Sequence, residues 1–261
     1  MEEYYIAFKE KRSIHAEAQF EVDTFKKAFL DIYDQIGVHD WGSFTISVDP
    51  YFPELLWEFY SSYRTRQRLL KHKDRIETLP CLPLVWVCGQ EVPITPKAIN
   101  SLYWVELIQS HSTFSKKVED KANQFQWVAN MIAIGQPQWS ISRGLIHHRD
   151  LKFEARMWLE LVCERLVPSP NTTEVLIDVS ILIVCIMDHL HINVGELTVD
   201  QFKRRDKQQA TTLSYPSLVS MLCVRAACPL FRPLDRTMWD DSVIILATKI
   251  DKDTPVMKQT K

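Results

Sequence analysis

The segment YRTRQRLLKHKDR, residues 63–75, has the residue types and spacing that best fit a chemical task. It holds six cations and a single acid, Asp74. In a helix, cations at i, i+4, i+7 and i+11 form one continuous stripe. The four residues at these positions are Arg64, Arg68, Lys71 and Arg75. Such a stripe can neutralise backbone phosphates of a nucleic acid, and the released counterions would dominate the affinity.

Two other interpretations of these basic residues stay open. A solvated basic helix, balanced by the acidic remainder of the chain, has the same composition, and a basic run can also act as a nuclear import signal. A smaller segment, FKRRDK at residues 202–207, has the same ambiguity. Its cations near the start are Lys203, Arg204 and Arg205. Both segments are therefore candidate contacts to nucleic acid or to an acidic partner.

Three stretches resemble catalytic or ligand-binding motifs but lack residues that the chemistry requires. GVHDWGS, residues 37–43, is close to a phosphate-binding loop, yet Ser43 follows Gly42 directly where the motif needs a lysine. HHRD, residues 147–150, resembles a kinase catalytic loop without the accompanying Gly-rich loop, strand lysine or DFG segment. On a helix, His189 and His191 would lie roughly 200° apart, so they predict a helix end rather than a metal site.

Hydrolytic and metal-dependent chemistry has no better support in the sequence. There is no GxSxG turn, and 33 acidic residues in 261 always include neighbours, so acidic pairs carry no information. The sequence therefore predicts a protein that is not an enzyme and that uses no cofactor and no metal. A transposition enzyme, with clustered carboxylates and Mg²⁺ or Mn²⁺, is the least favoured alternative.

Composition indicates a folded, helical, intracellular protein. The chain is 46% hydrophobic with a formal charge of -2, so nothing draws it as a whole to nucleic acid or to an anionic membrane. Only 6 glycines occur, which favours helices over turn-rich β architectures. The 6 cysteines include no CxxC pair, and we expect free thiols in a nuclear or cytoplasmic location. The charged start predicts no signal peptide, and the most apolar run, residues 179–187, is too short to span a bilayer.

Hydrophobic periodicity and local punctuation predict the elements. Leu84–Cys88 and Glu91–Ile94 flank Gly89-Gln90 and predict a hairpin with a type II′ turn, placed at an edge because Pro93 cannot sit in a central strand. Thr95 caps the next helix, with Pro96 at its first position. Other helices are predicted at 22–37, 53–63, 114–133, 151–166, 173–190, 196–208 and 215–227, and SVIILAT near 242–248 is a late strand or packed segment. The predicted fold is mostly α, a single multi-helix globular domain with a small edge β-hairpin.

Several of these pieces, taken in order, resemble the putative plant transposon protein domain, a family found in retroelement-associated open reading frames. LLWEFYSSY is similar to the family's LVREFYANL, and residues 87–100 fit its VRGxxVxFSPxxIN pattern. Downstream, LKFEARMWLELVCERLVPSPNTTEV, HINVGELTVDQF and LSYPSLVSMLCVRAAC resemble LKxxAKxWxxFVxxRLxPSxHxSxV, INVGxxIxxEI and LxFPxLIxxLCxxAGV. Gln90 and Asn171 depart from the basic residue and the histidine that are usual in the family.

The resemblance implies a family domain over residues 11–232, with an N-terminal extension at 1–10 and a charged C-terminal extension at 233–261. It marks positions with structural roles and no catalytic residues. These positions are Trp41, Gly89, Asn100, Trp139, Trp158, Pro168, Gly195 and Pro216. For Asn100 we expect a hydrogen bond to nearby backbone, because a buried amide without a partner costs about 1–3 kcal/mol.

The sequence thus predicts a non-enzymatic binding or assembly module derived from a plant mobile element. Its partner would be another protein or a second copy of the chain, and it would not be membrane-bound. The alternative is a nucleic-acid-binding protein that uses the basic residues within 64–75.

Overall fold

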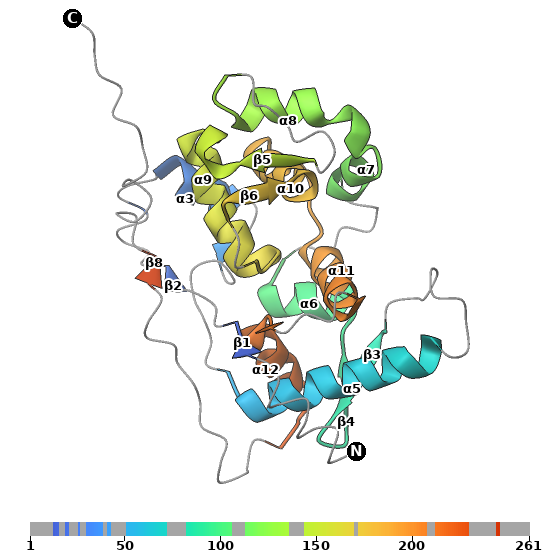
Figure 1. Ribbon diagram of the computed structural model, residues 1–261. Helices are drawn as coiled ribbons and strands as arrows, with labels where there is room; N and C mark the ends of the chain where they lie inside the picture. Colours follow the sequence, from blue (N-terminus) through green and yellow to red (C-terminus); the bar gives the residue numbers. More distant parts are fainter. Residues whose placement is uncertain are drawn as a thin grey trace, which may run out of the picture. The chain divides into compact units, whose positions relative to one another are not determined.

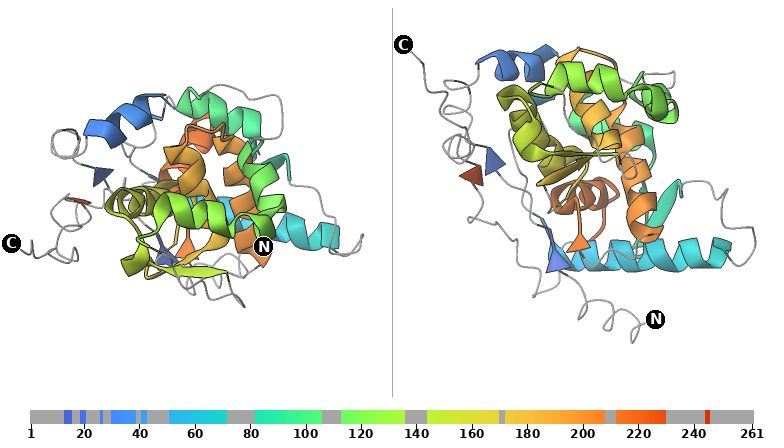
Figure 2. Two further views of the ribbon diagram at one scale, coloured as in Figure 1. Left: turned by 90° about the horizontal axis from the view of Figure 1, so that it is seen from above. Right: turned by 45° about the horizontal axis from the view of Figure 1, so that its top comes forward.

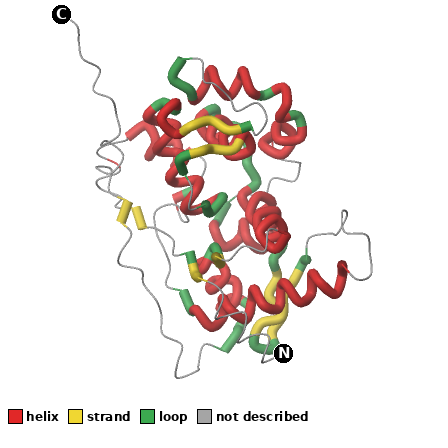
Figure 3. The backbone as a smooth tube through the Cα atoms, viewed as in Figure 1, coloured by secondary structure: helices red, strands yellow, loops and turns green. Residues whose placement is uncertain are grey.

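The computed structural model describes residues 13–15, 19–20, 26, 30–38, 41–42, 51–71, 82–105, 113–135, 144–169, 172–207, 212–229 and 244–245. Helices dominate these residues, and the strands form only small pairs, which confirms the mostly α fold (Figures 1 and 3). The chain groups into two compact units, each built from separate stretches of sequence. None of the helices within the described ranges is long and apolar enough to cross a membrane.

The first unit comprises Met1–Ala18, Ser47–Leu107 and Asn193–Val243. Its helices are α5 (Pro53–Lys71), α6 (Pro96–Tyr103), α11 (Val194–Lys207) and α12 (Pro216–Arg225). The antiparallel hairpin β3 (Leu84–Val87) and β4 (Gln90–Pro93) packs on α5, and β1 (Ser13–Ile14) pairs in parallel with β7 (Thr212–Leu213). Figure 2 shows α5 as a long, continuous helix.

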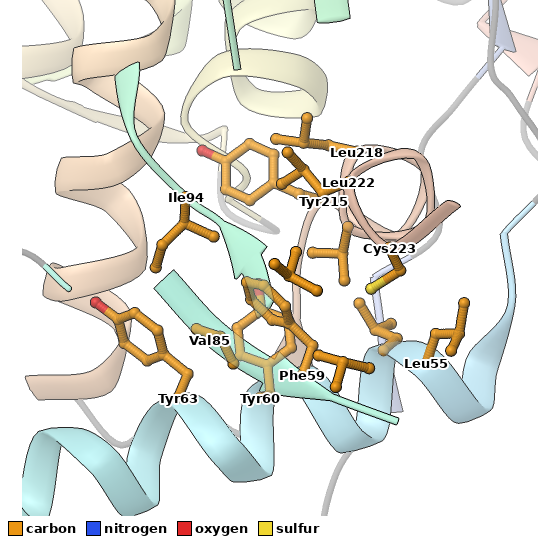
Figure 4. Packing of buried hydrophobic residues seen from close by; sticks show 14 of the residues in the cluster. Leu55, Phe59, Tyr60, Tyr63, Val85, Ile94, Tyr215, Leu218, Leu222 and Cys223 are labelled. Carbon is orange, nitrogen blue, oxygen red and sulfur yellow. The ribbon is translucent and has the colours of Figure 1, made fainter. Parts of the chain in front are cut away.

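The core of this unit forms where aromatic residues of α5 meet α11, α12 and the hairpin. Phe59, Tyr60 and Tyr63 recur at helical spacing, so they share one face of α5. Phe202 of α11 lies among these rings, with centroids 5.5 Å from Phe59 and 6.2 Å from Tyr63, and Tyr215 lies 5.4 Å from Phe202. Figure 4 shows the α5 side chains packed close to Val85 and Ile94 of the hairpin region and to α12.

The second unit comprises Gln19–Ile46, Ile108–Ile192 and Ile244–Lys261. Its helices are α3 (Leu30–Val38), α7 (Thr113–Glu119), α8 (Phe125–Ile132), α9 (Phe153–Leu161) and α10 (Ile177–Met187). The short turns are η2 (Lys121–Asn123), η3 (His148–Asp150) and the π turn η4 (Val162–Leu166). The strand pairs are β5 (Leu145–His147) with β6 (Glu174–Leu176), antiparallel, and β2 (Gln19–Phe20) with β8 (Ile244–Ile245), parallel. The central helix α10 is buried along most of its length.

The hairpin turn differs from the predicted type II′. Val87 pairs with Gln90, so the two turn residues are Cys88 and Gly89, with φ of 50° and 77°. Positive φ at both positions is the type I′ geometry. Glu58 of α5 holds this turn, because its carboxylate accepts the Cys88 N–H at 2.6 Å and lies 3.2 Å from Cys88 Sγ. A tertiary contact therefore places a cysteine where glycine or asparagine is usual.

Several predicted helices also have different limits, and α5 continues from the predicted end at residue 63 to Lys71. The segment predicted as one helix at 114–133 breaks into α7, η2 and α8, because Asp120 accepts hydrogen bonds from the side chains of Asn123 and Gln124. The helix predicted to start at residue 173 starts at Ile177, since 174–176 pair with β5. Helix α3 continues through Gly37 to Val38. The residues of 22–29 other than 26 lie outside the described residues.

Candidate functional site: the α6–α11 junction and the exposed surfaces of the two units

A buried polar network joins α6 and α11 in the first unit. Thr95 accepts the Ala98 N–H at 3.2 Å and caps α6, and Pro96 occupies the first turn, as the sequence predicts. Asn100 on the same helix is completely buried. Its Nδ2 donates to Asn193 Oδ1 at 2.9 Å, and its Oδ1 accepts the Gly195 N–H at 2.7 Å.

Asn193 completes this network at the start of α11. Its Oδ1 also accepts the Glu196 N–H at 3.1 Å, in the manner of an N-terminal helix cap. One buried amide of α6 thus satisfies both a backbone N–H of α11 and the side chain that caps α11. Since an unpaired buried polar group costs free energy, the loss of any one of these partners would destabilise the junction.

Gly195 allows the two helices to approach this closely. A Cβ added at Gly195 would lie 2.3 Å from Pro96 O, 2.7 Å from Asn100 Oδ1 and 2.8 Å from Pro96 Cα. No side chain fits at these distances unless the backbone of α6 shifts. The glycine is therefore required by space rather than by an unusual φ.

The first basic segment is only partly exposed. Arg64 has 7% of its surface exposed, because it follows Tyr60 by one turn on the face of α5 that packs into the core. Arg68 is exposed, and both arginines have interactions within the chain. The side chain of Lys71 and residue Arg75 lie outside the described residues. The expected stripe therefore does not start at Arg64, which corrects that part of the prediction.

The second basic segment lies at the C-terminal end of α11. Arg204 is exposed and Lys203 is half-buried. Arg205 is also half-buried, and its Nη1 donates to Thr212 O at 3.5 Å. Phe202, just before these residues, packs against Phe59 and Tyr63 of α5. The two basic segments, separated by more than a hundred residues, thus lie on helices that meet at one aromatic cluster.

The other positions marked by the resemblance lie mostly in the interior. Trp41 and Trp158 are buried, and Trp158 Nε1 donates to Gln35 Oε1 at 3.0 Å. Pro168 is buried after the π turn, and Pro216 occupies the first turn of α12. Gly89 forms the exposed hairpin turn. Trp139 lies outside the described residues.

The thiols of the described residues are poorly suited to nucleophilic chemistry. All five cysteines described are thiols rather than disulfides, and four of them are buried. Burial raises the pKa of Cys163 and of Cys185 from 9.0 to about 12, and burial also raises the pKa of Cys223 and of Cys228. Because the thiolate is the reactive form, these four side chains act as small apolar groups.

Two tryptophans of the first unit are exposed. Trp104 follows the last residue of α6 in a left-handed conformation, φ 58°, and 85% of its surface is exposed. Trp86 lies on the outward side of β3 opposite Glu91, and 49% of its surface is exposed. The alternation of the hairpin could have indicated Trp86, whereas no local signal indicated that Trp104 lies outside the core.

Acidic, histidine and cysteine side chains do not gather for metal binding within the described parts of the chain: no group of three or more has a suitable arrangement. His189 has φ 52° just after α10, so the segment after Met187 is a helix end, as the sequence predicts. The motif-like HHRD stretch covers the end of β5 and the turn η3.

Comparison with known proteins identifies the family. Comparisons with curated proteins and with solved structures give no match. A family model described as "Putative plant retrotransposon-related domain" matches residues 38–229, which include the hairpin, the α6–α11 junction and both basic segments. This span is most of the chain, and the chain belongs to the plant retrotransposon-related domain family.

Proposed function

We propose that this domain is a non-enzymatic binding and assembly module that associates with copies of itself through the exposed tryptophans of the first unit. The observation that carries the proposal is the exposure of Trp104, at 85%, together with that of Trp86 on the same unit. Tryptophan offers a large apolar surface with a polar edge and is enriched in the centres of protein interfaces. An exposed ring of this size favours association.

The thiols and the main polar network of the described residues fit a non-enzymatic role. The buried thiols remain protonated near neutral pH because burial raises their pKa. The polar network around Asn100 joins α6 to α11, which is a structural role. A nuclear or cytoplasmic location stays a prediction from composition.

Sedimentation velocity over a concentration series tests self-association. The wild-type chain should show a sedimentation coefficient that rises with concentration. Trp104→Ser should weaken the association constant by about 30-fold or more, as expected for a central interface residue worth about 2 kcal/mol or more. Trp86→Ser should weaken it less, because that ring is less exposed.

The matched control is Leu176→Ser, which removes an exposed apolar side chain, 54% exposed, from the second unit. It should leave the association unchanged. A wild-type chain that remains monomeric at every concentration, or a Trp104→Ser variant that associates as the wild type does, would refute the proposal.

Nucleic-acid binding is the second candidate function, favoured by the aromatic cluster that brings α5 and α11 together. The residues concerned are the partly or fully exposed cations Arg66, Arg68, Lys203 and Arg204. If all four contact phosphates, the logarithm of the affinity should fall with the logarithm of salt with a slope of about -3 to -4.

Fluorescence anisotropy with labelled single- and double-stranded DNA and RNA measures this slope. Changing the four cations to Gln should abolish binding, while Lys97→Gln with Lys116→Gln, two exposed cations elsewhere, should leave most of it. Equal loss in both variants would indicate a general charge effect, and no binding near physiological salt would remove this candidate.

A further inference from the structure

A polar groove lies in the second unit where β5 and β6 meet the turn η3. The register pairs His147 with Glu174, and the His148 N–H donates to Thr173 O at 2.9 Å. These contacts tie the end of β5 to the segment that enters β6. The groove has a volume of about 460 Å³. It is lined by His147, His148, Arg149, Glu160, Thr172 and Thr173.

The lining chemistry favours an oxyanion. Guanidinium and hydroxyl groups donate hydrogen bonds, imidazoles donate at one nitrogen at least, and only one carboxylate is present. The planar fork of Arg149 matches the oxygens of a phosphate group. Its side chain is 83% exposed, and its Nε lies 3.7 Å from Asp150 Oδ1. A pair so exposed contributes little, so a phosphate can compete for the guanidinium.

Glu160 restricts which anion fits. A carboxylate in the wall repels a bare anion, but it accepts a hydrogen bond from a hydroxyl group on the same ligand. Glu160, His148 and Thr173 each have a further interaction within the chain.

We propose that this groove binds the phosphate ester of a hydroxylated sugar, with the phosphate on Arg149 and a sugar hydroxyl on Glu160. The volume falls in the range of small-molecule sites, about 300–1,000 Å³. This group occurs in free sugar phosphates and nucleotides, and also at the phosphorylated end of a nucleic-acid strand. The site is independent of the exposed tryptophans, so its test is independent of self-association.

Isothermal titration calorimetry of the full chain separates the possibilities. The ligands are ribose 5-phosphate, inorganic phosphate, and a single-stranded oligonucleotide with and without a 5′-phosphate. Ribose 5-phosphate should bind more tightly than inorganic phosphate. Arg149→Gln should weaken binding by about tenfold or more, since it removes a charge-assisted hydrogen bond. Glu160→Gln should remove the preference for the sugar phosphate.

Control variants on α7 carry the same charge changes outside the groove: Lys116→Gln and Glu119→Gln, both exposed, should bind as the wild type does. Tighter binding of the phosphorylated strand, lost in Arg149→Gln, assigns the groove to strand ends, and binding of ribose 5-phosphate alone assigns it to small ligands. No saturable binding of either at millimolar concentration would overturn the proposal. So would equal binding by the wild type and Arg149→Gln, or an undiminished sugar preference in Glu160→Gln.

Discussion

Replacement of Gly195 by alanine tests how closely α6 and α11 approach each other. The added Cβ would lie 2.3 Å from Pro96 O, and ordinary contact begins near 3.4 Å, so the backbones must separate locally by about 1 Å. The hydrogen bond from Gly195 N–H to Asn100 Oδ1, 2.7 Å long, would then exceed hydrogen-bonding distance.

The cost follows from these two effects. Overpacking costs about 1–3 kcal/mol, and an unpaired buried hydrogen-bonding group costs about 1–3 kcal/mol more. The better helix propensity of alanine offsets at most about 1 kcal/mol of this destabilisation. We therefore expect the free energy of unfolding to fall by about 3 kcal/mol, which corresponds to a melting temperature lower by about 6–12 °C.

Urea titration followed by far-ultraviolet circular dichroism measures this change. Gly37→Ala is the matched control, because Gly37 is also helical and nothing lies within 4 Å of an added Cβ; this variant should be neutral or up to about 1 kcal/mol more stable. Asn100→Ala should lower the free energy of unfolding less in the Gly195→Ala background than in the wild type, because Gly195→Ala has already broken the hydrogen bond. An unchanged midpoint for Gly195→Ala would refute the reasoning.

Other contacts give sharper tests by substitution or pH. Asn100→Ala alone leaves the Gly195 N–H unpaired and should lower the free energy of unfolding by about 2–4 kcal/mol in the same titration; a wild-type midpoint would contradict the network. Cys88→Asn should maintain or raise stability by up to about 1 kcal/mol, because asparagine adopts the positive φ of a type I′ turn, whereas Cys88→Val should lower it by about 1–2 kcal/mol; the reverse order would exclude this turn. The pKa of Cys163 is about 12 in the folded protein and 9.0 in the unfolded chain. The contribution of the protonated thiol to the free energy of unfolding is therefore complete below pH 9.0 and is lost as pH rises toward 12. Cys163→Ala should flatten the decline of unfolding free energy in that window by about 1.4 kcal/mol per pH unit, and an equal slope in both proteins would contradict its raised pKa.

Features set by local chemistry could be predicted from the sequence. The Thr95 cap and Pro96 fix the start of α6 through contacts within four residues. Pro93 restricts β4 to a two-stranded ribbon. Hydrophobic periodicity likewise indicated most of the helices. These signals lie within a few residues of the structure that they specify, so a single sequence contains them.

Features set by contacts between distant residues could not be predicted in the same way. The partners of Asn100 lie 93 and 95 residues away. Arg64 carries a charge that indicates exposure, yet its position on α5 places it beside the aromatic core. The type I′ turn at Cys88 depends on Glu58, 30 residues earlier. In each case, tertiary packing overrides the local preference of the residue.

Sedimentation velocity of the wild type, Trp104→Ser and Leu176→Ser tests the proposed assembly role most directly. We predict concentration-dependent association that Trp104→Ser weakens by about 30-fold or more and that Leu176→Ser leaves intact. A monomeric wild type across the series, or the same association in all three proteins, would contradict an assembly surface at Trp104.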